Sequence, residues 1–279
     1  MSTAHPDETP PHTTLPMKGS ILGIDVSMTR YEEAVGAITA AAAENRALSV
    51  SALAVHGIMT GVLDAAQRWR LNRLDMVVPD GQPVRWALNL LYDAKLADRV
   101  NGPDLTLKVC EAAAEQKLPV YFYGSRPEVL ELLTTRLRQQ YPGLVIAGAR
   151  PSLFRKSTDA ERLEIIREIR DSGARIVFVG LGCPRQEVWA YENAAEIGVP
   201  VLAVGAAFDF HAGLLPQAPR FMRDKGLEWA YRLYQEPRRL WRRYVLLNPL
   251  YISLFLLQWS GLNRFKNEGR KPEIMEYYA

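Results

Sequence analysis

The sequence predicts an α/β fold: a Rossmann-like parallel sheet covered by helices, with a helical membrane-binding appendage at the C-terminal end. Short apolar runs that end in Gly or Asp alternate with longer segments of helical period, which is the pattern of βαβ units. Each helical segment is polar along one side and carries Leu, Ile, Val or Ala along the other, as expected of helices that cover a sheet face. After Phe221 the alternation stops and a basic, aromatic segment of helical character follows.

The alternating elements lie between residues 20 and 225, which we expect to form one Rossmann-like domain. The apolar runs predicted as strands are Leu48–Val55, Met76–Val78, Val120–Tyr123, Val145–Ala147, Ile176–Val179 and Val201–Val204. The segments predicted as helices are Thr29–Glu44, Ile58–Leu71, Gly102–Gln116, Pro127–Gln140, Asp159–Ser172 and Arg185–Ile197. Residues 1–19 are rich in Pro and Thr and lack the apolar stretch of a secretory signal, so we expect a disordered tail there.

Composition excludes several classes of protein. The chain has 279 residues, of which 48% are hydrophobic and 23% charged, so it is neither a disordered chain nor a collagen-like or disulfide-stapled one. Its 2 cysteines, Cys110 and Cys183, form no CxxC pair, which favours a reducing compartment. Residues 220–243 hold eight Lys or Arg against three Asp or Glu, within a chain of net charge +3. This local excess predicts an anionic partner, whether a membrane surface, a nucleic acid or a phosphate-bearing substrate.

Residues 226–279 are predicted to form a basic, amphipathic appendage, in which Pro237 is suited to begin a second helix. On a helical wheel an apolar stripe holds Trp229, Leu233, Leu240, Tyr244 and Leu247, and the adjacent basic stripe holds Arg232, Arg239 and Arg243. This favours helices that lie on a membrane surface, because the apolar run Leu250–Leu257 is too short to cross a bilayer. A core-packed helix with solvated arginines and a homo-oligomer interface remain alternatives. Nucleic-acid binding is not expected, because few aromatic rings are left for base stacking.

Four loops follow predicted strands, at the edge of a parallel sheet where ligands bind. In VVPDG, Asp80 is either a ligand-facing carboxylate or only a helix N-cap. In YFYGSRPE, Gly124 and Ser125 precede a helix whose first turn favours a phosphate. In FVGLGCPRQE, Gly182 and Gln186 lie in a second such loop, although a lone GxG is a weak signal and also fits a tight turn.

The fourth loop, VGAAFDFHAG, places Asp209 among aromatic residues in a stretch that we do not expect to form a regular amphipathic helix. A buried Asp needs a partner, so it is either a structural hydrogen-bond centre or a ligand contact. No P-loop, GxGxxG, GxSxG or HExxH motif occurs, and the four His are scattered without a DxD pair. We therefore expect no metal and no cofactor, and catalysis that depends on an acid or base and on dipoles that stabilise phosphate.

The segments DGQPVRWA, LADRVNGPDL, YFYGS, FVGLGCPRQE, GAAFDFHAG and EPRRLWRRY occur in this order. Their spacing resembles that of the WecG/TagA/CpsF glycosyltransferases, glycosyltransferase family 26, over about residues 21–250. The resemblance implies an inverting, metal-independent transfer of a sugar from a UDP-sugar to a polyprenyl-diphosphate-linked sugar, in the assembly of bacterial exopolysaccharide or another cell-surface polysaccharide. It also implies a peripheral location at the cytoplasmic face of the inner membrane, through the appendage.

The resemblance assigns roles to particular positions. Asp80 matches the general base that takes a proton from the attacking acceptor hydroxyl. Arg99, Asp104, Gln186 and Asp209 match residues around the donor pocket, where Gly124, Ser125 and Gly182 of the two glycine-containing loops are also expected to bind substrate. Arg232, Arg239 and Arg242 match appendage arginines that meet the diphosphate of the lipid carrier or of UDP, to which a planar guanidinium is suited.

One departure from the family's pattern concerns the strand before Asp80. Many members carry a TxN motif where this chain has Ala52 and Ala54, which make no side-chain hydrogen bonds. His56, two positions on, is either a substitute substrate contact or a satisfied, partly buried histidine. The donor sugar therefore stays open between a hexose, a uronic acid and an N-acetylmannosamine. The alternative to an enzyme is a non-catalytic, membrane-associated module that binds a nucleotide sugar.

Overall fold

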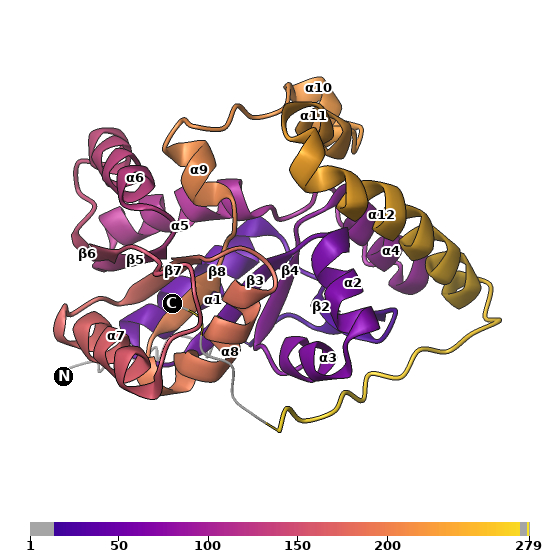
Figure 1. The fold of residues 1–279 in the computed structure, drawn as a ribbon, viewed down its shortest axis with the longest axis horizontal. Coiled ribbons are helices and arrows are strands. Elements are labelled where there is room, and N and C mark those ends of the chain that lie inside the picture. Colours follow the sequence, from indigo (N-terminus) through magenta and orange to yellow (C-terminus); the bar gives the residue numbers. More distant parts are fainter. Residues whose placement is uncertain (1–13, 274–277, 279) are drawn as a thin grey trace, which may run out of the picture.

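The structure, a computed structural model, describes residues 14–273 and 278; the side chains of Arg220, Asp224, Arg239, Arg242 and Arg243 lie outside that description. Its centre is a six-stranded sheet of order β4-β3-β8-β7-β5-β6, with every pairing parallel (Figure 1). The strands are β3 (Leu48–Leu53), β4 (Met76–Pro79), β5 (Val120–Gly124), β6 (Ile146–Arg150), β7 (Ile176–Gly180) and β8 (Pro200–Ala203). All six predicted strands are confirmed. An antiparallel hairpin of β1 (Lys18–Ile21) and β2 (Ile24–Ser27), not predicted, precedes them.

The helices that cover the sheet include every segment predicted as a helix. They are α1 (Tyr31–Ala43), α2 (Val55–Leu63), α3 (Ala65–Leu71), α4 (Gln82–Tyr92), α5 (Gly102–Glu115), α6 (Pro127–Gln140), α7 (Asp159–Asp171), α8 (Arg185–Ile197) and α9 (Ala207–His211). They are followed by α10 (Arg220–Asp224), α11 (Glu228–Gln235) and α12 (Pro237–Trp259). The appendage thus contains two helices, and the second begins at Pro237 as expected.

Three details of the fold differ from, or add to, the expectations. The segment Ile58–Leu71 is two helices, because Asp64 leaves the helical region and its side chain accepts hydrogen bonds from the amides that open α3. The VGAAFDFHAG stretch forms no regular amphipathic helix, as expected, but it does contain the five-residue helix α9, which was not predicted. The folded chain also begins before residue 20, since Lys18 and Gly19 pair with β2; residues 1–13 of the expected tail lie outside the described residues.

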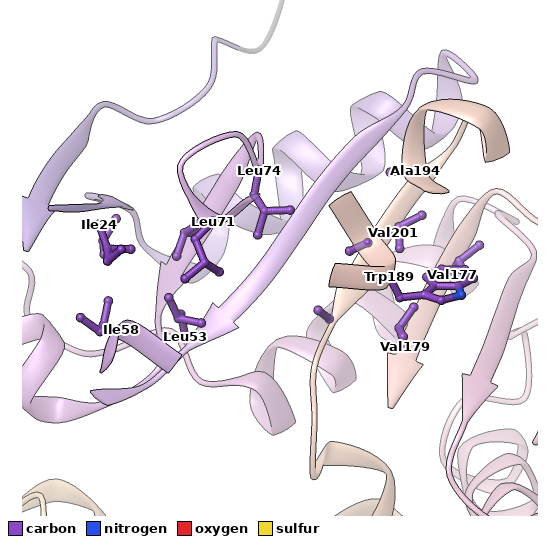
Figure 2. Close-up of a cluster of buried hydrophobic side chains, with 14 of the residues drawn as sticks. Ile24, Leu53, Ile58, Leu71, Leu74, Val177, Val179, Trp189, Ala194 and Val201 are labelled. Carbon is purple, nitrogen blue, oxygen red and sulfur yellow. The ribbon is translucent and has the colours of Figure 1, made fainter. Parts of the chain in front are cut away.

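The strands divide their side chains between two cores, one on each face of the sheet. Alternate residues of a strand point to opposite faces, so Phe122 and Phe178 stack at 5.1 Å on the face of α1, α5 and α6. The opposite core contains Trp189 of α8 packed among valines of β7 and β8 (Figure 2). Each core is built of apolar side chains, and the few buried charged groups are paired beside them, as in the ion pair of Arg70 and Glu192 between α3 and α8.

Helix α12 packs along the outside of the domain, beside α4 and α2 (Figure 1). Tyr251 is buried there and donates a hydrogen bond to the carbonyl of Pro83, and Gln258 bonds both to the amide of Leu22 and to the carbonyl of Ser20. The chain then runs back along the domain, where the amide of Arg270 donates to a carbonyl at the start of α3. Across the described residues, no helix combines the length and apolar composition needed to cross a bilayer.

Candidate active site

Two adjoining cavities lie at the carboxyl ends of the strands. The main cavity, of about 630 Å³, extends over the loops that follow β3, β5, β7 and β8. The side cavity, of about 140 Å³, lies between the starts of α2 and α4 and the two appendage helices. Five residues line both cavities: Ala54, His56, Asp80, Glu228 and Arg232. These residues form the junction of the two cavities, where a ligand in one cavity would contact a ligand in the other.

Asp80 is at this junction because β4 ends one residue before it. The N-cap of α4 is Gly81, and no side chain caps that helix, so the carboxylate of Asp80 is not used as an N-cap. The backbone amide of Asp80 donates to the carbonyl of Leu53 at 3.3 Å, and its own carbonyl accepts from Nη1 of Arg99 at 3.2 Å. These bonds fix the backbone and leave the carboxylate facing the two cavities.

The environment of Asp80 makes its carboxylate a stronger base than an exposed one. Burial raises its pKa from the usual 3.8 to about 6, with a further upward contribution from the nearby carboxylate of Glu228. The guanidinium groups of Arg99 and Arg232 act in the opposite direction. Asp80 is half-buried and lines both cavities. A carboxylate with a pKa near the working pH can accept a proton efficiently and is still ionised at neutral pH.

An ion pair connects the Rossmann-like domain to the appendage beside Asp80. Arg99, in the loop before α5, pairs with Glu228 at the start of α11, and both side chains are largely buried. Because the second guanidinium nitrogen of Arg99 is bonded to the backbone of Asp80, the position of α11 is coupled directly to the junction. Arg232, one turn along α11, lines both cavities, and its guanidinium lies 5.7 Å from the ring of Phe210.

The two glycine-containing loops meet at the floor of the main cavity. Gly124 has a φ of +111°, and a Cβ at this position would lie 2.8 Å from the backbone of Gly180, so only glycine allows this approach. The amide of Ser125 then donates to the carbonyl of Gly180 at 3.0 Å. Ser125 and Gly182 line the cavity, and Gly124 lies beneath it. The first turns of α6 and α8 therefore face the same space, which favours negative charge.

Gln186 is held in place by its neighbour on α8. Its Oε1 accepts from the amide of Gly182 at 3.1 Å, and its Nε2 donates to Oε1 of Glu187 at 2.9 Å. The same Glu187 oxygen accepts from the hydroxyl of Ser51 at 3.2 Å. Burial raises the pKa of Glu187. Gln186 was predicted as a site residue, whereas Glu187, which orients it, was not.

Of the remaining residues that the sequence predicts for the site, some line the cavities and others do not. Asp209, on α9, lines the main cavity, and His56 at the start of α2 lines both. Ala52 and Ala54 form part of the wall, as expected from their position in the sequence. Asp104 lines neither cavity: it accepts from Nδ2 of Asn101 at 2.7 Å and lies 4.0 Å from Nη1 of Arg223. The side chains of Arg239 and Arg242, on α12, lie outside the described residues.

Several cavity residues were not predicted as site residues. Glu228, Gln82, Trp229, Tyr244 and Asn248 help to line the side cavity, and Arg126, Phe154, Arg185 and Glu187 help to line the main one. Trp229 and Tyr244 were recognised only as members of an apolar stripe, where they do meet, with ring centroids 5.9 Å apart. Gln82, Arg126, Arg185 and Glu187 lie in the loops that the sequence did single out, next to the residues chosen there. Glu228, Asn248 and Phe154 reach the cavities only through the appendage and the β6–α7 loop.

A match to a family model identifies the protein family of this chain. The model of the glycosyl transferase WecG/TagA/CpsF family matches residues 19–265. The chain belongs to the WecG/TagA/CpsF glycosyltransferase family. Membership implies a glycosyltransferase of cell-surface polysaccharide synthesis, and the matched region includes both cavities and both appendage helices. Within the described part of the chain, no group of three or more His, Cys, Asp and Glu side chains is arranged to hold a metal ion.

Proposed function

We propose that this family member is an inverting, metal-independent glycosyltransferase that moves a sugar from a UDP-sugar to a polyprenyl-diphosphate-linked sugar. The observation that carries the proposal is the position of Asp80 at the junction of two cavities. Transfer requires the acceptor oxygen to meet the anomeric carbon of the donor, with a base within reach of the acceptor hydroxyl. The UDP-sugar occupies the larger cavity and the acceptor sugar the smaller one, so that only their reacting atoms meet beside Asp80.

The chemistry follows from this arrangement. Asp80 takes the proton of the acceptor hydroxyl as that oxygen attacks the anomeric carbon, on the side opposite the leaving UDP. The bond between the anomeric carbon and the diphosphate breaks, and the diphosphate leaves with the electron pair. The starts of α6 and α8, which follow Ser125 and Gly182, and the side chain of Arg232 border the main cavity, where they stabilise the charge of the departing diphosphate. The non-catalytic alternative gives no role to a basic carboxylate at this junction.

The acceptor is lipid-linked, and we propose that the appendage holds the protein on the cytoplasmic face of the inner membrane. Supporting this, α12 exposes a series of large apolar side chains to solvent in the described structure: Val245, Leu246, Ile252, Leu256 and Trp259. The same helix carries Arg239 and Arg242, whose charge suits anionic lipid or diphosphate. The side cavity lies between this helix and the domain, so an acceptor sugar bound there would be next to the helix that holds the protein on the membrane.

The activity is tested with the purified full chain. UDP-glucose, UDP-glucuronic acid and UDP-N-acetylmannosamine are each incubated with polyprenyl-diphosphate-linked glucose or N-acetylglucosamine, and the products are identified by mass spectrometry, with and without EDTA. We expect one donor to be consumed only when an acceptor is present, and EDTA to have no effect. Asp80→Asn should lower the rate by about 10² or more. Asp93→Asn, at an exposed position after α4, is the matched control; wild-type turnover by the Asp80 variant would refute the proposed base.

The membrane contact is tested by flotation with anionic phosphatidylglycerol vesicles. Ile252→Glu combined with Leu256→Glu places two carboxylates on the exposed side of α12, so we expect the variant to stay with the unbound protein. Leu163→Glu, at a similarly exposed apolar position on α7, should float as the wild type does. Equal flotation of all three proteins would show that α12 is not the anchor.

A further inference from the structure

The main cavity has an outer end that the proposed transfer chemistry does not use. Asp80 follows β4 and Phe154 follows β6, and these strands are the two opposite edges of the sheet. Neighbouring strands are about 4.8 Å apart, so the two residues stand at opposite ends of an elongated space. The starts of α6 and α8, which follow Ser125 and Gly182, lie between them.

Phe154 is unusual for an aromatic residue in a loop. Its side chain is 58% exposed and lines the cavity, and no ring of another described residue stacks on it. The cavity's other phenylalanine, Phe210, lies close to the guanidinium of Arg232 at the Asp80 end. When a flat ligand covers an exposed apolar ring, apolar surface is removed from water, and this favours binding.

The position of Phe154 is fixed by the backbone around it. Its φ is +55°, a left-handed conformation that a bulky residue seldom adopts and that costs free energy. The conformation is supported by two bonds at 2.9 Å, from the amide of Phe154 to the hydroxyl of Ser152 and from the amide of Ser152 to the carbonyl of Ser125. The second bond ties the Phe154 loop to the loop at the start of α6, so the ring is held at a set place beside the cavity floor.

We propose that the outer end of the main cavity is a nucleobase subsite in which the base of the donor stacks on Phe154. This inference rests on the proposed function, because it takes the donor to be a nucleotide sugar. The three parts of such a donor then match three regions in order: the sugar beside Asp80, the diphosphate over the first turns of α6 and α8, and the base on Phe154. The exposed side chains of Arg126 and Arg185, at the starts of α6 and α8, line the middle of the cavity, where they can meet the diphosphate.

Stacking of a base on an aromatic ring adds affinity without changing the reacting atoms. Loss of the ring should therefore weaken the binding of ligands that contain a base and leave the binding of a bare diphosphate unchanged. This separates a base contact from a general disturbance of the cavity, which would weaken both ligands together.

The test is isothermal titration calorimetry of the full chain with UDP and, separately, with inorganic pyrophosphate, at one ionic strength. Phe154→Ala should weaken UDP binding about tenfold and leave pyrophosphate binding within about twofold, whereas Phe154→Tyr should keep both affinities. Leu153→Ala is the matched control, because Leu153 is the exposed neighbour that does not line the cavity. Equal UDP binding by wild type and Phe154→Ala, or a parallel loss of pyrophosphate, would overturn the subsite. A wild-type chain that binds no UDP would overturn the proposed function, and this inference with it.

Discussion

Ionisation of Asp80 is expected to lower the free energy of unfolding of the protein, and this decrease can be measured. The pKa of Asp80 is about 6 in the folded chain against the usual 3.8. At about 1.4 kcal/mol for each pH unit, the difference corresponds to about 3 kcal/mol. Because Asp80 is partly open to the cavities, we take this as an upper value.

The sign follows from proton binding. Between about pH 4 and pH 6 the folded chain holds a proton on Asp80 that the unfolded chain has already released. Stability therefore falls as the pH rises through this range, and above about pH 6 the whole cost is present. The neutral variant Asp80→Asn has no such step. Relative to wild type it should gain up to about 3 kcal/mol between pH 4 and pH 7, while its transfer activity is lost.

The measurement is urea unfolding, followed by tryptophan fluorescence, at several pH values from 4 to 8. The quantity compared is the difference in free energy of unfolding between Asp80→Asn and wild type, so that all other titrations cancel. Asp93→Asn, which removes an exposed carboxylate, should not reproduce this pH dependence. Parallel stability curves for wild type and Asp80→Asn across the range would refute the argument that burial raises the pKa of Asp80.

Two further predictions concern the carboxylate beside Asp80 and a buried ion pair that does not line the cavities. Because the carboxylate of Glu228 contributes to the raised pKa of Asp80, Glu228→Gln should move the acid limb of the kcat/KM profile to lower pH; an unchanged limb would contradict this coupling. Arg70 and Glu192 form an ion pair 3.2 Å long between α3 and α8, with side chains only 3% and 5% exposed. Arg70→Met should lower the free energy of unfolding by about 3–5 kcal/mol because it strands a buried carboxylate, and adding Glu192→Leu should restore much of the loss; a single variant as stable as wild type in urea would show that the pair is not needed.

Hydrophobic periodicity predicts the sheet of this chain well, because buried parallel strands leave continuous apolar runs such as the one in β7. It misses elements whose form depends on distant contacts. The β1–β2 hairpin is only four residues in each strand and is held partly by Gln258, far along the chain. The break between α2 and α3 depends on a single side chain, Asp64, that turns back to cap the next helix.

The residues of the candidate site also fall into two groups: those that local sequence predicts, and those whose position depends on distant contacts. Asp80 follows its strand directly, so its place at the sheet edge can be predicted from local sequence, and the family resemblance adds its role. Glu228 and Phe154 cannot be found by this reasoning. The first reaches the site only because α11 returns over the sheet to meet Arg99, and the second only because its loop is hydrogen-bonded to that of Ser125.

Helix α12 is fastened near both of its ends. Near its start Leu240 is buried and the preceding helix is paired to Arg99; near its far end Gln258 bridges the β1–β2 turn. A rod attached in this manner has little freedom to swing. If α12 lies on a bilayer as proposed, it would hold Asp80 at a constant height above the lipid headgroups. The distance of the acceptor sugar from the membrane would then help to decide which lipid-linked sugars are glycosylated.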